Sequence, residues 1–99
     1  MSRNIAVMTA HTATGAGGSV ALYPGLLNVT LSGTFEGTVQ IERSLDAGST
    51  WVPLSVASAT PLSLTVPVTI VLEEAEQGVL WRSRCTAHTS GTATATISQ

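Results

Sequence analysis

The chain has 99 residues, of which only 10% are charged, and it contains no lysine. An ordinary soluble domain carries about 25% charged residues, so threonine, serine, alanine and glycine must cover most of this surface. The formal net charge of −2 provides no basic footprint for phosphate groups, and we expect no nucleic-acid partner. This length is sufficient for one hydrophobic core, so we predict a single domain over residues 1–99.

The sequence also lacks the signals of export or membrane insertion. Met1–Ala10 does not combine a basic segment with an apolar core, and no 18 apolar residues run together. Cys85 is the only cysteine and cannot form an internal disulfide, which fits synthesis in a reducing cytoplasm. A weakly charged exterior suits a protein covered by neighbouring subunits, so we predict a homo-oligomer. A threonine-rich monomer is the alternative.

Alternation of apolar and polar residues dominates the chain and predicts strands throughout. Gly15–Gly18 is expected to form a flexible turn, which would leave residues 1–18 as an N-terminal arm able to add a strand to a neighbour's sheet. The predicted strands cover residues 5–14, 19–22, 27–31, 34–43, 51–56, 62–70, 79–85 and 92–98.

The clearest pairing is between Thr34–Arg43 and the segment that begins at Trp51, which together indicate an antiparallel hairpin. Pro53 and Pro67 favour edge positions or bulges, because proline cannot donate to the ladder. About seven or eight short strands with regular turns predict an all-β fold, an antiparallel β-sandwich with jelly-roll or immunoglobulin-like wiring. A small barrel is the alternative.

One specific motif lies in the turn of this hairpin, where Ser44, Asp46, Gly48, Thr50 and Trp51 match the pattern S-x-D-x-G-x-T-W. The pattern resembles the Asp-box of sialidases and many unrelated β-proteins. Asp46 is expected to accept hydrogen bonds from turn amides, Gly48 to adopt a positive φ, and Trp51 to enter the core. The Ser44 and Thr50 hydroxyls can tie the strand ends. The resemblance implies a folding element and no sialidase activity.

A wider resemblance involves Phe35–Trp51 and Gly78–Gln99. The second segment holds a G-V-x-aromatic-R-x-R-C-T strand followed by a serine-glycine turn. Together the two segments are similar to small β-rich virion proteins of tailed bacteriophages, which serve as head decoration, head fibre or tail components.

The resemblance implies a structural protein of the virion. We expect a capsid decoration or cement protein, made in the host cytoplasm and placed on the capsid surface, which binds between subunits of the major capsid protein. A trimer is the favoured form because of the local symmetry of a shell. The alternative is a tail or head-fibre module that contacts glycans on the host surface.

No combination of residues points to catalysis, a cofactor or a metal. His11 and His88 are isolated and expected in exposed polar positions, and Cys85 is expected to be an inert core thiol. The acidic stretch Glu73–Glu76 could offer oxygen ligands to calcium together with Asp46. Its spacing matches no calcium-binding loop, and a solvated acidic turn is expected there.

Arg82 and Arg84 lie on the same face of a predicted strand, where two like charges favour an acidic partner such as Glu42. That partner can belong to the same chain or to a neighbouring subunit, and both readings stay open. Tyr23 is the aromatic residue left for stacking on a glycan, because the other three are expected in the core. These four residues are the predicted interface.

Overall fold

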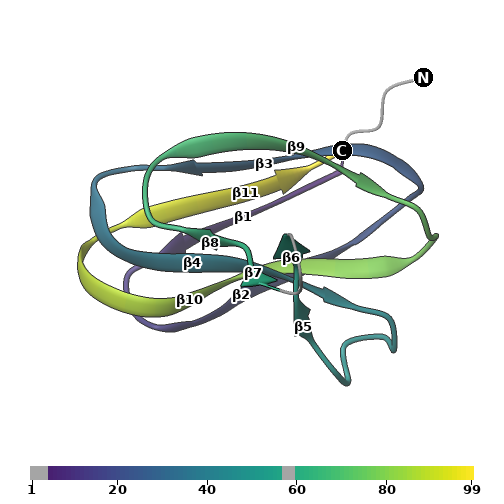
Figure 1. Cartoon of the computed structure of the whole chain (residues 1–99), viewed down its shortest axis with the longest axis horizontal. Coiled ribbons are helices and arrows are strands. Elements are labelled where there is room, and N and C mark those ends of the chain that lie inside the picture. The colour runs from purple at the N-terminus through teal and green to yellow at the C-terminus, as the bar shows by residue number, and fades with distance from the viewer. Residues whose placement is uncertain (1–4, 57–59) are drawn as a thin grey trace.

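The computed structural model describes residues 5–56 and 60–99, and these residues form strands joined by turns (Figure 1). No helix that could span a membrane occurs among them. Four two-residue segments are β5 (Val52–Pro53), β6 (Ser55–Val56), β7 (Thr60–Pro61) and β8 (Ser63–Leu64). The long strands are β1 (Ala6–His11), β2 (Gly15–Leu22), β3 (Gly25–Ser32), β4 (Phe35–Ser44), β9 (Val68–Glu74), β10 (Val79–Gly91) and β11 (Ala93–Ser98).

The long strands form two antiparallel sheets that pack face to face, so the predicted β-sandwich is confirmed (Figure 1). One sheet has the order β1-β11-β3-β9, and the other has the order β2-β10-β4-β5, with β8 also paired to β4. Each connection between consecutive long strands crosses from one sheet to the other. This wiring is that of a jelly roll, in which strands that follow one another along the chain lie in different sheets.

The core lies between the two sheets and is built by the alternation seen in the sequence. Val39 and Ile41 on β4 are fully buried, as are Val29 on β3 and Ile97 on β11. Because successive side chains of a strand point to opposite faces, every second residue of these strands reaches the core and the others face outward. Trp81 on β10 is the largest side chain in the core and is 1% exposed.

The prediction of a flexible turn at Gly15–Gly18 is wrong. These glycines begin β2, which pairs with β10, and the chain turns earlier, at residues 12–14. Gly17 has no room for a side chain, because a Cβ there would lie 2.5 Å from the Thr9 hydroxyl oxygen. Glycine serves close strand packing at this position and gives no sign of a hinge.

The predicted N-terminal arm is paired within its own chain. Residues 6–11 form β1, which pairs along its whole length with β11, and residues 15–18 belong to β2. Residues 1–4 of the predicted arm lie outside the described residues.

The single strand predicted over residues 62–70 is divided in the structure. Leu64 pairs with Val39 in one sheet, whereas Val68 begins β9 in the other sheet. The chain crosses between the sheets over residues 65–67, so Val66 is exposed although it continues the apolar alternation. Periodicity alone does not detect a strand that changes sheets, because the pattern is the same on both sides of the crossing.

Replacement of a central core residue tests this packing. We expect Ile97→Ala to lower the free energy of unfolding by about 2–5 kcal/mol, through lost apolar burial and the cavity left behind. The outward neighbour supplies the control, because Thr96→Ala is expected to change stability by no more than about 0.5 kcal/mol. Urea unfolding monitored by tryptophan fluorescence measures both, and equal losses would contradict the assigned faces of β11.

Candidate functional site

The turn from Ser44 to Trp51 is held together by its own side chains. The Ser44 hydroxyl donates to Asp46 Oδ1 at 2.8 Å and accepts the amide of Gly48, also at 2.8 Å. The amide of Thr50 donates to Asp46 Oδ1 at 2.8 Å, as predicted for this carboxylate. Gly48 adopts a positive φ of 93°, and Ala47 one of 60°. The sequence therefore encodes a self-contained turn.

These hydrogen bonds also fix the charge of the turn. The Thr50 amide and the Ser44 hydroxyl donate to the carboxylate and hold the pKa of Asp46 below its usual value. Asp46 is thus ionised at neutral pH, and its side chain is exposed. No arginine pairs with it among residues 5–56 and 60–99.

The prediction that Trp51 enters the core is wrong. Its ring is only half-buried and lies under the guanidinium of Arg82, 4.1 Å from the ring centroid. The core at this end of the sandwich is already filled by Trp81, which lies on the inner face of β10. Trp51 instead covers the outer face of the same sheet, where its ring shields the Arg82 charge from solvent.

Arg82 finds its acidic partner within the same chain. It is opposite Glu42 in the register of β10 and β4, and its Nε donates to Glu42 Oε1 at 2.7 Å. The intramolecular reading of this pair is therefore the correct one. Arg84, two residues further along β10, is exposed and makes no ion pair in the described part of the chain.

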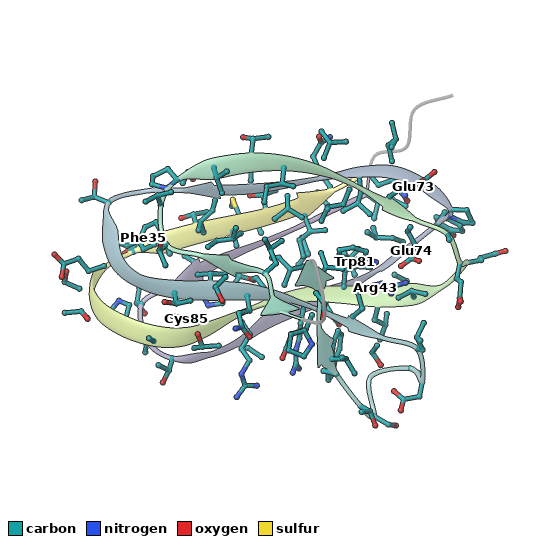
Figure 2. The ribbon with its side chains drawn as sticks, viewed as in Figure 1. Phe35, Arg43, Glu73, Glu74, Trp81 and Cys85 are labelled. Carbon is teal, nitrogen blue, oxygen red and sulfur yellow. The ribbon has the colours of Figure 1, made fainter. Side chains whose placement is uncertain are left out.

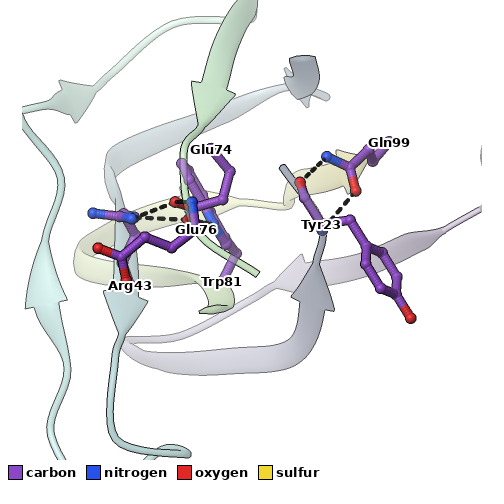
Figure 3. Close-up of polar contacts among 6 residues, drawn as sticks. All are labelled: Tyr23, Arg43, Glu74, Glu76, Trp81 and Gln99. Carbon is purple, nitrogen blue, oxygen red and sulfur yellow. Dashed lines mark hydrogen bonds and ion pairs between the residues drawn. The ribbon is translucent and has the colours of Figure 1, made fainter. Parts of the chain in front are cut away.

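A buried ionic cluster occupies the end of the sandwich at which β9 turns into β10 (Figures 2 and 3). Glu74 is 1% exposed, and its two oxygens accept hydrogen bonds from Arg43 at 3.1 and 2.6 Å. The Trp81 indole N–H donates to Glu74 Oε1 at 2.7 Å, and the amide of Glu76 donates to Oε2 at 3.1 Å. Arg43 also lies 5.5 Å from the centroid of the Trp81 ring.

This cluster corrects the expectation of a solvated acidic turn. Glu73 and Glu76 are exposed as predicted, but Glu74 points into the sandwich. Its burial could have been predicted in part, because apolar and polar residues alternate in β9 and Glu74 lies on the same side of the strand as the partly buried Ile70 and Leu72. Sequence reasoning missed it because a glutamate among three is assumed to be exposed unless a partner is known.

The pKa of Glu74 results from opposing effects. Burial alone would raise it, but the hydrogen bonds from Arg43, the Glu76 amide and the Trp81 indole, together with the positive charge of Arg43, lower it. Glu74 is therefore ionised while buried, and its charge is neutralised by a bidentate arginine.

Glu74→Gln tests how much this cluster contributes to the stability of the fold. We expect the free energy of unfolding at neutral pH to fall by about 2–3 kcal/mol, because Arg43 loses its charged partner. Because the pKa of Glu74 is lowered in the folded protein, its contribution to stability is complete above about pH 4.3, the pKa of a free glutamate. This contribution is lost as the pH falls through the folded pKa. Urea unfolding should show the gap between wild type and variant narrowing in acid; a constant gap would contradict an ionised Glu74.

His11 is buried, which contradicts the predicted exposed position. It is 4% exposed, and its Nε2 lies 2.8 Å from the hydroxyl oxygen of Ser83 on the inner face of β10. Residue 11 follows the inward phase of β1, so burial on the core side is the regular position for this side chain. Burial lowers the pKa of His11, and the neutral ring is the folded form.

The lowered pKa of His11 predicts a loss of stability in mild acid. The unfolded chain binds a proton near pH 6.5 and the folded one only at lower pH, so the stabilisation is complete above pH 6.5 and is lost as the pH falls from there to the folded pKa. His11→Gln, which keeps a hydrogen-bonding partner for Ser83, should flatten this dependence of stability on pH below about pH 6.5. Thermal unfolding of both proteins across this range measures it, and parallel curves would refute the assignment.

The remaining predicted residues are separated from these clusters. Cys85 is buried, as expected for a core thiol, and its Sγ donates to the carbonyl of Ala87 at 3.2 Å. His88 is half-buried, with Nε2 2.8 Å from the carbonyl oxygen of Gly91. Tyr23 is 43% exposed, and its backbone is bound on both sides by the side-chain amide of Gln99 (Figure 3). Among the described residues, no group of three or more histidine, cysteine or acidic side chains could hold a metal ion.

A pocket of about 550 Å³ opens beside the Ser44–Trp51 turn. Its apolar lining residues include Leu45 and Val52, which are mostly exposed, and its charged lining residues are Asp46 and Arg43. The residues that line it are Arg43, Leu45, Asp46, Thr50, Val52, Pro53, Leu54 and Ser55.

The outward face of the four-stranded sheet is the other candidate surface, and we name it the neutral face. Its apolar members Met8, Leu26 and Val71 are 70%, 68% and 60% exposed. Among the described residues, Glu73 at the end of β9 is its single charge. The outward side chains of its strands are Ala6, Met8, Ala10, Leu26, Asn28, Thr30, Ser32, Thr69, Val71, Glu73, Thr94, Thr96 and Ser98.

Threonines form a line across the middle of this face. The register places Met8 beside Thr96, Thr96 beside Thr30, and Thr30 beside Thr69, so one transverse row holds a methionine and three threonines. Such a row presents methyl and hydroxyl groups and carries no charge. A partner can therefore cover the middle of this face without removing an ion from water.

Comparison with family models, with curated proteins and with solved structures finds no match for this chain.

Proposed function

We propose that the chain is a structural protein of a bacteriophage virion, namely a decoration or cement protein that binds between subunits of the capsid shell. The observation that carries this proposal is the neutral face, a sheet surface with one charged residue at its end. A protein that binds a preformed lattice needs a surface that several subunits can cover at small desolvation cost.

The placement of the two phage-like segments supports the proposal. Phe35–Trp51 contains β4, and Gly78–Gln99 contains β10 and β11. β4 and β10 are paired from Leu80 opposite Ser44 to Gly91 opposite Phe35, so these strands of the two segments lie side by side, whereas β11 belongs to the other sheet. Jelly rolls occur in viral shell proteins and in many other proteins, so the fold is compatible with this role and does not select it.

The mechanism of such a protein is mass action. A protein that binds the assembled shell and not its separated subunits stabilises the shell against heat and internal pressure. The partner is then the major capsid protein, and the protein is made in the host cytoplasm and ends on the capsid surface, where copies are proposed to assemble as homo-oligomers.

The alternative role in glycan binding has less support from the described residues. Sugars usually stack on exposed aromatic rings. Tyr23 is exposed, whereas Trp51 is covered by Arg82 and Trp81 is buried. The pocket beside the Ser44–Trp51 turn contains no aromatic side chain in its lining.

Co-sedimentation with expanded capsids tests the proposed function. We expect the wild-type protein to bind shells and to raise their temperature of disruption. Thr96→Glu should weaken binding by about tenfold or more, because shell binding would bury the new carboxylate without a partner in the middle of the neutral face. Ala21→Glu, on an exposed position of β2 in the other sheet, is the matched control and should bind as wild type does.

The two failures have different meanings. A wild-type protein that ignores shells and leaves their heat resistance unchanged refutes the virion role. Shell binding that is equally strong in Thr96→Glu keeps the role but assigns the contact to another surface.

A further inference from the structure

The pocket beside the Ser44–Trp51 turn combines apolar walls with a carboxylate that lacks a cation. Asp46 Oδ1 accepts hydrogen bonds from Ser44 and Thr50, and no ion pair involves Asp46 in the described ranges. Arg43 also lines the pocket, but Glu74 already neutralises its guanidinium through two hydrogen bonds. The pocket therefore fits a side chain with an aliphatic stem and a cationic tip.

Arg84 is such a side chain and belongs to this chain. Of the arginines in the described part, Arg43 is paired with Glu74 and Arg82 with Glu42, whereas Arg84 makes no ion pair. It is exposed on β10, and its neighbours in register are Gln40 and Ala16, which are uncharged. The chain has no lysine that could compete for the same role.

Arg84 and the pocket are apart within one copy, because Arg84 is opposite Gln40 of β4, which lies roughly 13 Å along the strand from the start of the turn at Ser44. Arg43, on the pocket wall, is opposite Trp81 and faces Glu74 in the interior. Arg84 follows the outward phase of β10, together with Arg82. At this separation Arg84 does not reach the pocket of its own copy, and no ion pair joins it to Asp46 among the described residues.

We propose that copies of this protein associate by insertion of Arg84 of one copy into the Asp46 pocket of another. The guanidinium meets the Asp46 carboxylate, and the methylene stem packs against Leu45 and Val52. A contact between two different patches is head-to-tail, and it closes into a ring when the rotation between copies allows it. This inference is independent of the virion role, since it concerns the protein alone.

Two conservative variants remove one side of the contact each. Asp46→Asn keeps an oxygen that can accept the Thr50 and Ser44 hydrogen bonds but removes the charge, and Arg84→Gln removes the cation from an exposed position. Glu36→Gln, an exposed acid at the start of β4, is the control. Thermal unfolding first establishes that all three are folded.

Solution mass by light scattering and sedimentation then measures association. We expect wild type and Glu36→Gln to associate, and Asp46→Asn and Arg84→Gln each to lose about tenfold or more in association constant, because removing one partner of a close charge pair is this costly. A mixture of Asp46→Asn with Arg84→Gln should form complexes that neither forms alone, because the first supplies an intact Arg84 and the second an intact pocket.

Several outcomes would overturn the inference. One is a wild-type protein that stays monomeric at millimolar concentration. Another is association that survives both variants, or a loss confined to Asp46→Asn, which would assign the pocket to a different cation. None of these results bears on binding to capsids, which the co-sedimentation assay decides separately.

Discussion

The buried carboxylate of Glu74 is the constraint on which this end of the sandwich depends. It lies at the end of β9, in the four-stranded sheet, and its partners Arg43 and Trp81 belong to β4 and β10 of the other sheet (Figure 3). A charge is tolerated in the interior only when its oxygens are satisfied by well-placed donors. Apolar contacts tolerate small shifts because they lack direction, whereas this cluster fixes one relative position of the two sheets.

The cluster also determines how the charges of β4 are distributed. Arg43 points inward to Glu74, and the preceding Glu42 points outward to Arg82, beneath which Trp51 lies. Two adjacent residues thus neutralise one charge on each face of the same sheet. Ser44 follows immediately and begins the turn that carries Asp46, so the position of the pocket is tied to the buried ion pair through one residue of chain.

Much of the fold was predictable because most strands bury one face only. The alternation in β4 and β10 predicted which residues enter the core, including Val39, Ile41 and Trp81, and the hairpin that begins at Trp51 was also predicted. The register and the jelly-roll order were not, because pairing between strands distant in sequence leaves no local signal. The prediction for Gly15–Gly18 failed for a related reason. Glycines occur both in turns and in strands, and composition alone does not distinguish the two.

The candidate site was predictable only where its contacts are local. The hydrogen bonds within the Ser44–Trp51 turn follow from residue types at fixed spacing, and the structure contains those predicted for Asp46. The sequence left open whether Arg82 pairs with Glu42 of the same chain or of a neighbouring subunit. The register of β4 and β10 places the two residues of one chain opposite each other. Glu74 and His11 depend on contacts between strands of different sheets, and no spacing along the chain encodes such contacts.

The distribution of charge gives the two proposed contacts separate places on the molecule. The neutral face belongs to the four-stranded sheet, whereas Arg84 belongs to the outer face of the five-stranded sheet and the Asp46 pocket lies beside its β4–β5 turn. A ring built through Arg84 therefore leaves the neutral face of every copy uncovered by that contact. In the proposed virion role, several such faces on one ring would bind a repetitive lattice with an effective concentration that a single copy lacks. Weak contacts at each neutral face would then be sufficient for firm attachment of the ring.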